Sequence, residues 1–365
     1  MEYRTNRKTG DKISVIGFGT SSVAASGEAE AVKTIRMAYE NGINYYDLAT
    51  ADALTFDYFK EALSDVRKNV FYQLHFGANY ETGAYGWTTD VETVKKSVEW
   101  QLEHLNTDYI DYGFIHCLDE TNDWDDYKRN GVYDYLLKMR EEGVVKHIGL
   151  SSHTPAAINR IMDEAKPDML MFSVNPGYDY QQGEFANGSV DDRAAIYKRC
   201  EAEGTGISVM KPFSGGQLLD FSLSPFGKAL TAYQCLQYAL DRPGVLTVLP
   251  GASNSKELKN ILGFLSASDE EKDYSVIGTF SPADAVGKCV YCNHCRPCPV
   301  GIDIGLVNKY YDLSRNRDTL ADEHYRGLSL NAGDCIHCGR CDGRCPFGVK
   351  QSDRMNEIAE YFKYR

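Results

Sequence analysis

Hydrophobic and polar positions form two kinds of segment along the chain. Short runs rich in β-branched and aromatic residues alternate with longer segments in which apolar residues recur every three or four positions. The short runs are typical of buried strands, and the longer segments of helices that cover a sheet. Eight runs are expected to be strands: Ile16–Thr20, Asn44–Leu48, Val70–Phe76, Tyr109–His116, Val145–Leu150, Met169–Val174, Gly206–Lys211 and Leu246–Pro250.

The segments between these strands carry helix signals. Four of them have clear helical spacing: Glu28–Tyr39, Val91–Leu105, Pro155–Glu164 and Pro225–Leu240. A capping-box pattern begins at Ser268, and three glycines follow expected helix ends: Gly42, Gly143 and Gly204. Strands that alternate with helices predict an α/β fold, a (β/α)8 TIM barrel whose active site lies at the carboxyl ends of the strands.

The barrel pattern ends before the chain does. Its last helix signal fades near Phe264, and Ser266–Val286 is expected to connect the barrel with a second region. We therefore predict a barrel over residues 1–280 and a second domain over residues 281–365. The 365 residues, 43% of them hydrophobic and 25% charged, suit a globular protein of this size.

Charge and hydropathy narrow the classes of partner. A net charge of −13 argues against nucleic acid, which is bound by clustered lysine and arginine. The first eight residues lack the apolar core of a signal peptide, and no apolar run approaches the roughly 20 residues that span a membrane. A cytoplasmic protein with no nucleic-acid or membrane partner is expected.

Cysteines are concentrated near the C-terminus. Eight of the eleven lie within residues 289–345, while Cys117, Cys200 and Cys235 are scattered. Such a cluster in a reducing compartment indicates metal ligation before disulfides. The first group is Cys289, Cys292, Cys295 and Cys298, and the second is Cys335, Cys338, Cys341 and Cys345.

Both groups have a spacing typical of iron–sulfur ligands. Three cysteines two residues apart are followed by a fourth before a proline. In two-cluster ferredoxins the fourth cysteine binds the other cluster, which would assign Cys298 to the second group and Cys345 to the first. The first group has two residues rather than three before its last cysteine, so the wiring stays open. Structural zinc is the alternative, but it rarely uses four cysteines so closely spaced. A ferredoxin-like domain with two [4Fe–4S] clusters is predicted.

Short motifs occur at the expected strand ends. They are Ile16–Thr20, Tyr45–Ala49, Asp108–Asp111 with His116, His147–His153 and Leu249–Ser253. In this order, over nearly the whole chain, they resemble the aldo-keto reductases, and specifically bacterial members with a C-terminal ferredoxin-like extension. The resemblance implies carbonyl reduction with a nicotinamide cofactor.

The resemblance also implies a catalytic set of tyrosine, lysine, aspartate and histidine. Asp47 matches the aspartate and His116 the histidine, whereas Asp52 stands at the tyrosine position and His75 at the lysine position. These four are the candidate catalytic residues, because two carboxylates and two imidazoles can move protons near neutral pH. The alternative is that the replaced positions only pack or are solvated, and that the ordinary ketone-reductase mechanism is lost.

A phenol could reach the site from elsewhere in the sequence. A shortened loop after the second strand would let Tyr58 or Tyr46 supply it. Tyr85, Trp87 and Trp124 are expected in loops near the barrel mouth, where aromatic residues either line a pocket or, more commonly, pack.

Cofactor contacts follow from the same resemblance. The loop from residue 211 to 216 matches the segment that approaches the pyrophosphate, where glycine admits close backbone contact. The segment from residue 251 to 256 precedes a helix whose N-terminal amides can bind the adenosine phosphate. Glu257 takes the place of the family's arginine and would repel a 2′-phosphate, although Lys256 could compensate, so NADH is expected at least as much as NADPH. The candidates for cofactor binding are Ser151, Ser152, Lys211, Phe213, Gly215, Gly216, Gly251, Ser253 and Lys256.

Three functions are compatible with the sequence. The first is an oxidoreductase in which a small-molecule substrate, with NAD(P)H or a flavin at the barrel mouth, exchanges electrons with the clusters and with a ferredoxin or another redox protein. Because clusters carry single electrons and a nicotinamide carries a hydride, direct coupling needs a converter such as flavin, for which the sequence has no convincing motif. The second is an ordinary carbonyl reductase with structural clusters. The third is a non-enzymatic electron-transfer or scaffold protein.

Overall fold

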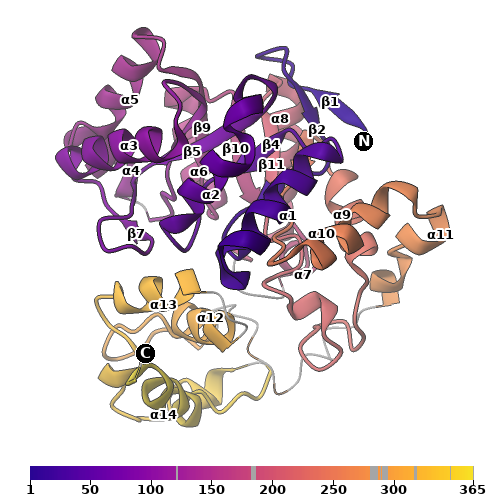
Figure 1. Cartoon of the computed structure of the whole chain (residues 1–365). Coiled ribbons are helices and arrows are strands. Elements are labelled where there is room, and N and C mark those ends of the chain that lie inside the picture. The colour runs from indigo at the N-terminus through magenta and orange to yellow at the C-terminus, as the bar shows by residue number, and fades with distance from the viewer. Residues whose placement is uncertain are drawn as a thin grey trace.

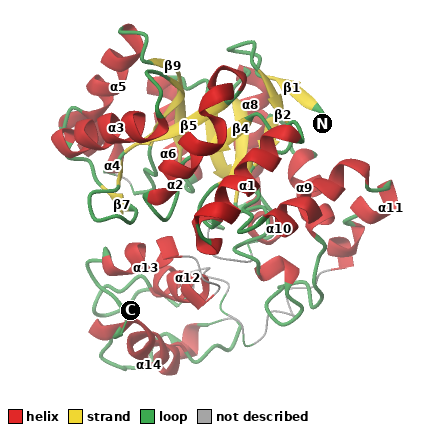
Figure 2. Ribbon diagram, viewed as in Figure 1, coloured by secondary structure: helices red, strands yellow, loops and turns green. Residues whose placement is uncertain are grey.

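The computed structural model describes residues 1–120, 122–181, 186–279, 287, 289, 295–315, 319–345 and 347–364. Strands and helices of the first two thirds of the chain form a barrel, and a group of helices from the C-terminal region lies beside one end of it (Figures 1 and 2). The chain thus contains the two parts that the sequence predicts.

The barrel has eight strands, which pair in parallel in chain order. Two bridges, from Ile16 to Val248 and from Gly19 to Gly251, join the first strand to the last. The predicted (β/α)8 barrel is confirmed, although its first strand is shorter than expected. The strands are β3 (Phe18–Gly19), β4 (Tyr45–Asp47), β5 (Phe71–Phe76), β8 (Ile110–Ile115), β9 (Val145–Ser151), β10 (Met169–Ser173), β11 (Gly206–Met210) and β12 (Val245–Val248).

Helices surround this ring. The α-helices of the first 279 residues are α1 (Glu28–Glu40), α2 (Leu54–Leu63), α3 (Val91–Leu105), α4 (Asp123–Arg129), α5 (Val132–Glu141), α6 (Pro155–Ala165), α7 (Pro176–Asp179), α8 (Val190–Glu203), α9 (Ala232–Leu240), α10 (Ser255–Leu262) and α11 (Asp269–Lys272). Short 3-10 helices are η1 (Val23–Ser26), η2 (Ser64–Asn69), η3 (Gln217–Leu219), η4 (Gly263–Ser266) and η5 (Ser275–Thr279).

One expected helix starts too early. The prediction of a helix over Pro225–Leu240 is wrong before residue 232, where α9 begins. Thr231 caps α9 by accepting a hydrogen bond from the Gln234 amide at 3.1 Å. The preceding loop is held instead by the burial of Phe226 and Leu230 against Leu218.

A small hairpin covers the amino-terminal end of the barrel. Strands β1 (Tyr3–Thr5) and β2 (Lys12–Ser14) pair antiparallel. Ile13 on β2 is fully buried with Tyr45 and Tyr112, whose side chains fill the barrel interior. Because this end is closed by packing, the opposite, carboxyl end is the one that can hold a site.

The C-terminal region has a small core of its own. Its elements are α12 (Ile304–Arg315), α13 (Thr319–Arg326), α14 (Gln351–Phe362) and the 3-10 helices η7 (Ala332–Asp334) and η8 (Asp342–Arg344). Val307, Met355 and Ile358 are buried together there. Ile277, just before the expected boundary, packs with Leu218 of the barrel region instead.

The two regions meet at the carboxyl end of the barrel. Leu313 and Ala321 are buried against Tyr178 of α7. Figure 1 shows α12 and α13 lying below the barrel, beneath the loop that carries strand β7 (Gly86–Trp87). Within the described part of the chain, none of the helices has both the length and the apolar character needed to cross a membrane.

Candidate active site at the barrel mouth

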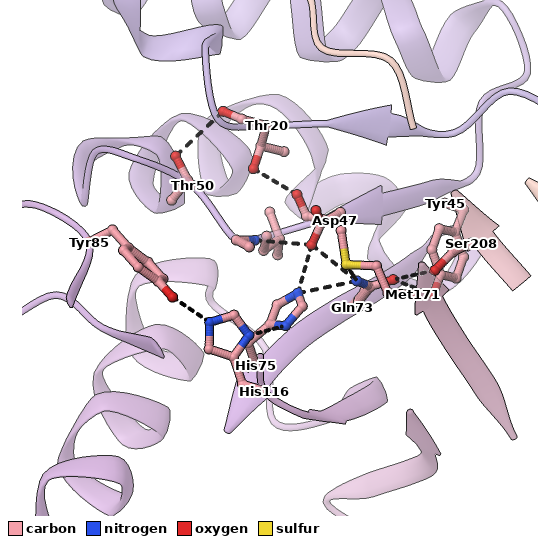
Figure 3. Close-up of polar contacts among 12 residues, drawn as sticks. Thr20, Tyr45, Asp47, Thr50, Gln73, His75, Tyr85, His116, Met171 and Ser208 are labelled. Carbon is pink, nitrogen blue, oxygen red and sulfur yellow. Dashed lines mark hydrogen bonds and ion pairs between the residues drawn. The ribbon is translucent and has the colours of Figure 1, made fainter. Parts of the chain in front are cut away.

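Four side chains at the mouth of the barrel form one continuous hydrogen-bonded chain (Figure 3). Asp47 Oδ1 lies 2.7 Å from His75 Nε2, and His75 Nδ1 lies 2.8 Å from His116 Nδ1. His116 Nε2 lies 2.6 Å from the Tyr85 hydroxyl. All four are buried, yet all line a cavity. We refer to these residues as the Asp47–Tyr85 chain.

Strand ends position three members of this chain. Asp47 ends β4, His75 lies on β5, and His116 directly follows β8. Tyr85 comes from a different element, the antiparallel hairpin of β6 (Ala78–Asn79) and β7 (Gly86–Trp87), which folds back over the end of β5. Trp87 Nε1 donates to the His116 carbonyl oxygen at 3.2 Å and fastens this hairpin to the site.

The hydrogen bonds have one consistent direction when Asp47 is ionised and both imidazoles are neutral. Asp47 can only accept, so His75 donates through Nε2 and accepts at Nδ1. His116 then donates through Nδ1 and accepts from the Tyr85 hydroxyl at Nε2. Every donor in this arrangement points toward Asp47, whose Oδ1 also accepts from the Ala49 amide at 3.1 Å.

Burial sets the protonation states of His116 and Tyr85, the outer two residues of the Asp47–Tyr85 chain. It lowers the pKa of His116 well below its usual value, and the neighbouring His75 and His324 lower it further. Burial also raises the pKa of Tyr85 well above its usual value. At neutral pH the outer end of the chain is therefore a neutral imidazole that accepts from an intact phenol.

Polar side chains around Asp47 hold the inner end of the Asp47–Tyr85 chain. Gln73 Nε2 donates to Asp47 Oδ1 at 3.2 Å, and Gln73 Oε1 accepts from the Tyr45 hydroxyl at 2.7 Å. Thr20 Oγ1 donates to the Asp47 carbonyl oxygen at 2.7 Å. These contacts fix the carboxylate before a substrate binds.

Asp52 lies apart from the other three candidate catalytic residues. Its Oδ1 accepts from the Leu54 amide at 2.9 Å at the start of α2, and Asp52 is not among the described residues that line the cavity. Tyr46 and Tyr58 belong to the hydrophobic core between strands and helices. Trp124 is buried and donates to Glu164, so it packs rather than lines the cavity.

The cavity in front of the chain has a volume of about 380 Å³. This falls within the range of small-molecule sites. Six of the nine candidate cofactor residues line it: Ser151, Lys211, Phe213, Gly215, Gly216 and Gly251. Ser152 is buried behind the wall, where its Oγ donates to Asp119 at 3.0 Å.

Ser253 and Lys256 lie at the N-terminus of α10, where the backbone amides already have acceptors. The Ser253 amide donates to Glu257 at 2.8 Å, and the Ser255 amide donates to Glu30 at 2.9 Å. The amides of Lys256 and Glu257 both donate to the side chain of Asn254. Hydrogen bonds from Ser255 and Lys33 lower the pKa of Glu30 to about 2, so this carboxylate is ionised. Two carboxylates therefore occupy the place where a phosphate would bind.

The C-terminal region closes one side of the cavity. Leu313 of α12 and Ala321 and His324 of α13 line it together with barrel residues. The His324 ring stacks on Tyr310 and lies 6.3 Å from the Tyr85 ring, measured between centroids. Nothing in the spacing of the sequence marks His324, because its role depends on how the two regions dock.

The described cysteines fit iron–sulfur ligation. No disulfide joins any two of the described cysteines. Cys298 lines one small cavity together with Cys335, Cys338 and Cys341, and Cys295 also borders it. The Gly287 amide bonds to the Phe347 carbonyl at 2.6 Å, which brings the start of the first group toward Cys345. Cys292 lies outside the described residues.

Comparison with known proteins agrees with this architecture. The sequence model of the aldo/keto reductase family matches residues 15–229, and that of a 4Fe-4S dicluster domain matches residues 285–349. The chain belongs to the aldo/keto reductase family. It is an oxidoreductase of this family that carries a 4Fe-4S dicluster domain.

Individual relatives extend the match over most of the barrel. L-galactose dehydrogenase of Arabidopsis thaliana is 28% identical over 290 residues, which cover 71% of this chain and 86% of the relative. The uncharacterized oxidoreductase YqkF of Bacillus subtilis (strain 168) is 24% identical over 273 residues, 68% of this chain and 85% of the relative. Among solved structures, aldo-keto reductase AKR11C1 from Bacillus halodurans (holo form) has a TM-score of 0.61 at 23% identity and covers 76% of this chain and 95% of its own.

Proposed function

We propose that this aldo/keto reductase oxidises a hydroxyl group of a small molecule to a carbonyl group, with NAD⁺ rather than NADP⁺ as the hydride acceptor. The observation that carries the proposal is the unbroken series of short contacts from Asp47 to Tyr85, at 2.7, 2.8 and 2.6 Å, with the Tyr85 hydroxyl at its outer end. Before a substrate binds, the Tyr85 hydroxyl lines the cavity and donates its hydrogen bond to His116 Nε2, 2.6 Å away. Such an oxygen accepts a hydrogen bond from a substrate hydroxyl, as a base requires.

The proton balance of the step is simple. The substrate hydroxyl gives its proton to Tyr85 while the Tyr85 proton passes to His116 Nε2. The Nδ1 proton of His116 passes to His75 Nδ1, and the imidazolium of His75 forms beside Asp47 at 2.7 Å. A carboxylate stabilises an adjacent imidazolium without becoming protonated itself. Burial lowers the pKa of His116, which disfavours keeping the proton on that imidazole.

The Asp47–Tyr85 chain replaces the tyrosine–lysine pair of the family with a longer path for the proton. His75, at the lysine position, contacts Asp47 as the lysine would, and the phenol comes from Tyr85 of the hairpin rather than from position 52. A bound nicotinamide would accept the hydride from the substrate carbon. Lys211 and the loop from Phe213 to Gly216 form the wall against which that cofactor would lie.

The N-terminus of α10 supports the preference for NAD⁺. Glu257 and Glu30 accept from the Ser253 and Ser255 amides, and Asn254 accepts from the next two. A 2′-phosphate would therefore meet two carboxylates instead of free donors. An adenosine ribose with a free 2′-hydroxyl carries no such charge. The first substrates to test are sugars, because the similar plant protein is named for the dehydrogenation of L-galactose.

Replacement of Tyr85 tests the proposal. The anaerobically purified holoenzyme is incubated with a panel of aldoses and NAD⁺, and formation of reduced nicotinamide is followed. We expect Tyr85→Phe to lower kcat about 10²–10⁴-fold, the usual contribution of a positioned acid or base. Tyr58→Phe, in the core, is the matched control and should leave kcat unchanged. Equal activity of Tyr85→Phe and the native enzyme would refute the assignment.

A second function, electron exchange between the cavity and the clusters, rests on a different observation. Leu313, Ala321 and His324, from the region with the cysteines, line the substrate cavity itself. In this proposal residues 281–365 form a domain with two [4Fe–4S] clusters that pass electrons to a ferredoxin or a similar redox protein. A flavin would have to convert a two-electron step into single electrons.

Cluster spectroscopy separates the two functions. If electrons reach the clusters, substrate added to the holoenzyme under argon produces an EPR signal of reduced clusters, and Tyr85→Phe abolishes that signal. If nicotinamide alone accepts the hydride, reduced nicotinamide forms and the EPR spectrum does not change.

A further inference from the structure

A second group of side chains, two of them on the cavity wall, lies outside the Asp47–Tyr85 chain. It consists of Cys117, Asp119 and His153, which follow strands β8 and β9. Cys117 Sγ lies 3.8 Å from Asp119 Oδ2 and 4.0 Å from His153 Nδ1, and these last two atoms are 2.7 Å apart. One ligand atom from each residue lies within 4.8 Å of the other two.

We propose that Cys117, Asp119 and His153 bind a divalent metal ion of the zinc class, with one coordination position open to the substrate cavity. A thiolate, an imidazole and a carboxylate are the three kinds of protein ligand that zinc uses, and three protein ligands with an open fourth position are typical of reactive zinc sites. In a tetrahedral zinc site the ligand atoms are about 3.5 Å apart. The three separations between ligand atoms, 2.7, 3.8 and 4.0 Å, lie on both sides of this value.

Neighbouring groups orient the ligands. Asp119 Oδ1 accepts from the Ser152 hydroxyl at 3.0 Å and from the His153 amide at 2.6 Å, which turns Oδ2 toward the thiol. Outer contacts of this kind fix the ligands of metal sites. Cys117 has a φ of +51°, an unusual backbone conformation for a residue with a side chain. Cys117 and His153 both line the cavity, so the open position would face the substrate.

The charge of the site accommodates the ion. Binding releases one proton, from the Cys117 thiol, while the His153 proton moves from Nδ1 to Nε2 so that Nδ1 can coordinate. A dication, one thiolate, one carboxylate and a neutral imidazole have no net charge. Lys211 and Lys309, which interact electrostatically with Cys117 and His153, then face a neutral centre rather than a cation.

Zinc binding to the intact holoenzyme tests this site independently of the proposed dehydrogenase reaction. The protein is equilibrated anaerobically with zinc chloride, and zinc, iron and sulfide are measured. We expect one zinc ion per chain in addition to intact clusters, with one sulfur and otherwise nitrogen or oxygen ligands in the zinc K-edge EXAFS. A zinc shell made of sulfur alone would mean binding at the cluster cysteines and would overturn the proposal, as would the absence of bound zinc.

Three variants make the test specific. Cys117→Ser should weaken zinc binding more than 100-fold, and Ser152→Ala, which removes only an outer contact, about 10- to 100-fold. Cys235→Ser, a buried cysteine in another part of the barrel region, is the control and should bind zinc as the native protein does. If Cys117→Ser does not fold, His153→Asn takes its place. Unchanged affinity in the folded variants contradicts the assignment.

Discussion

At the scale of single residues, His116 and His153 are histidines that the fold keeps neutral. Burial is the main cause that lowers the pKa of each, although the contact with Asp119 partly opposes it at His153. Both face the cavity at 5% exposure or less. Neutral imidazoles can relay protons or bind a metal ion, but keeping them neutral lowers the free energy of unfolding at acidic pH.

The sign of this effect follows from proton binding. Between the unfolded pKa near 6.5 and the lower pKa of the folded state, the unfolded chain protonates these histidines more than the folded chain does. The unfolded state then binds more protons, so stability falls as the pH falls, by up to about 1.4 kcal/mol per pH unit for each histidine. We expect the thermal unfolding midpoint of the holoenzyme to drop between pH 7.5 and pH 5.5.

The variant His116→Asn isolates one histidine. It should reduce the drop in unfolding midpoint, because one protonation difference is removed. His104→Asn, at a half-buried histidine in the last turn of α3 and outside the cavity, is the control and should keep the native drop. If the His116→Asn midpoint falls as steeply as the native one, neutral burial of His116 does not govern the acid response.

The sequence alone could identify the site residues whose position is fixed by the strand that carries or precedes them. Asp47 and His116 lie at strand ends, and the barrel brings the strand ends together, so their proximity was predictable. His75 was predictable for the same reason. Tyr85 was expected near the barrel mouth, but its contact with His116 was not predictable, because it depends on a hairpin of two-residue strands with no hydrophobic period of its own.

At the scale of elements, the proposed preference for NAD⁺ rests on the N-terminus of helix α10. Its N-terminal amides form the kind of site that binds anions, and Glu30 of α1 and Glu257 occupy it. The sequence predicted the helix and the repulsive role of Glu257. It could not reveal Glu30, which is separated by 225 positions from its partner Ser255.

Removing both charges should relax this preference. In the double variant Glu30→Gln and Glu257→Gln, each lost like charge removes about 1 kcal/mol of repulsion at 4 Å in water. We expect the ratio of kcat/KM for NAD⁺ to that for NADP⁺ to fall about tenfold or more. Steady-state kinetics with both nucleotides measure it. Glu270→Gln on α11, another exposed acidic residue, should not change the ratio.

At the scale of the whole molecule, the iron–sulfur region and the barrel share one cavity. The cysteine spacing predicted what this region binds, and the strand pattern predicted the barrel. Neither could predict the contact between them, because it depends on single apolar side chains such as Leu313, whose Cδ2 would lie 3.1 Å from a Cβ at Gly215. A Cβ at position 215 would require the Leu313 side chain to shift by a few tenths of an ångström, and the positive φ of Gly215 would add backbone strain.

His324 makes this shared cavity testable. Its ring lies next to the Tyr85 ring on the cavity wall, so in the proposed reaction it would contact a substrate held by Tyr85. We expect His324→Ala to raise KM for the substrate several-fold and to leave the dissociation constant of NAD⁺ nearly unchanged. Arg326→Ala, at the exposed end of the same helix, is the matched control.

Cluster removal should act through the same contact. In the proposed dicluster domain the clusters would hold the cysteine segments together. Because α12 and α13 lie in that fold, chelation of the iron should loosen the side of the cavity that these helices form. Substrate KM should then rise at least as much as in His324→Ala, and reconstitution of the clusters should restore it. If the cluster-free barrel keeps the native KM, the iron–sulfur region does not shape the cavity in solution, and His324 is a bystander at its edge.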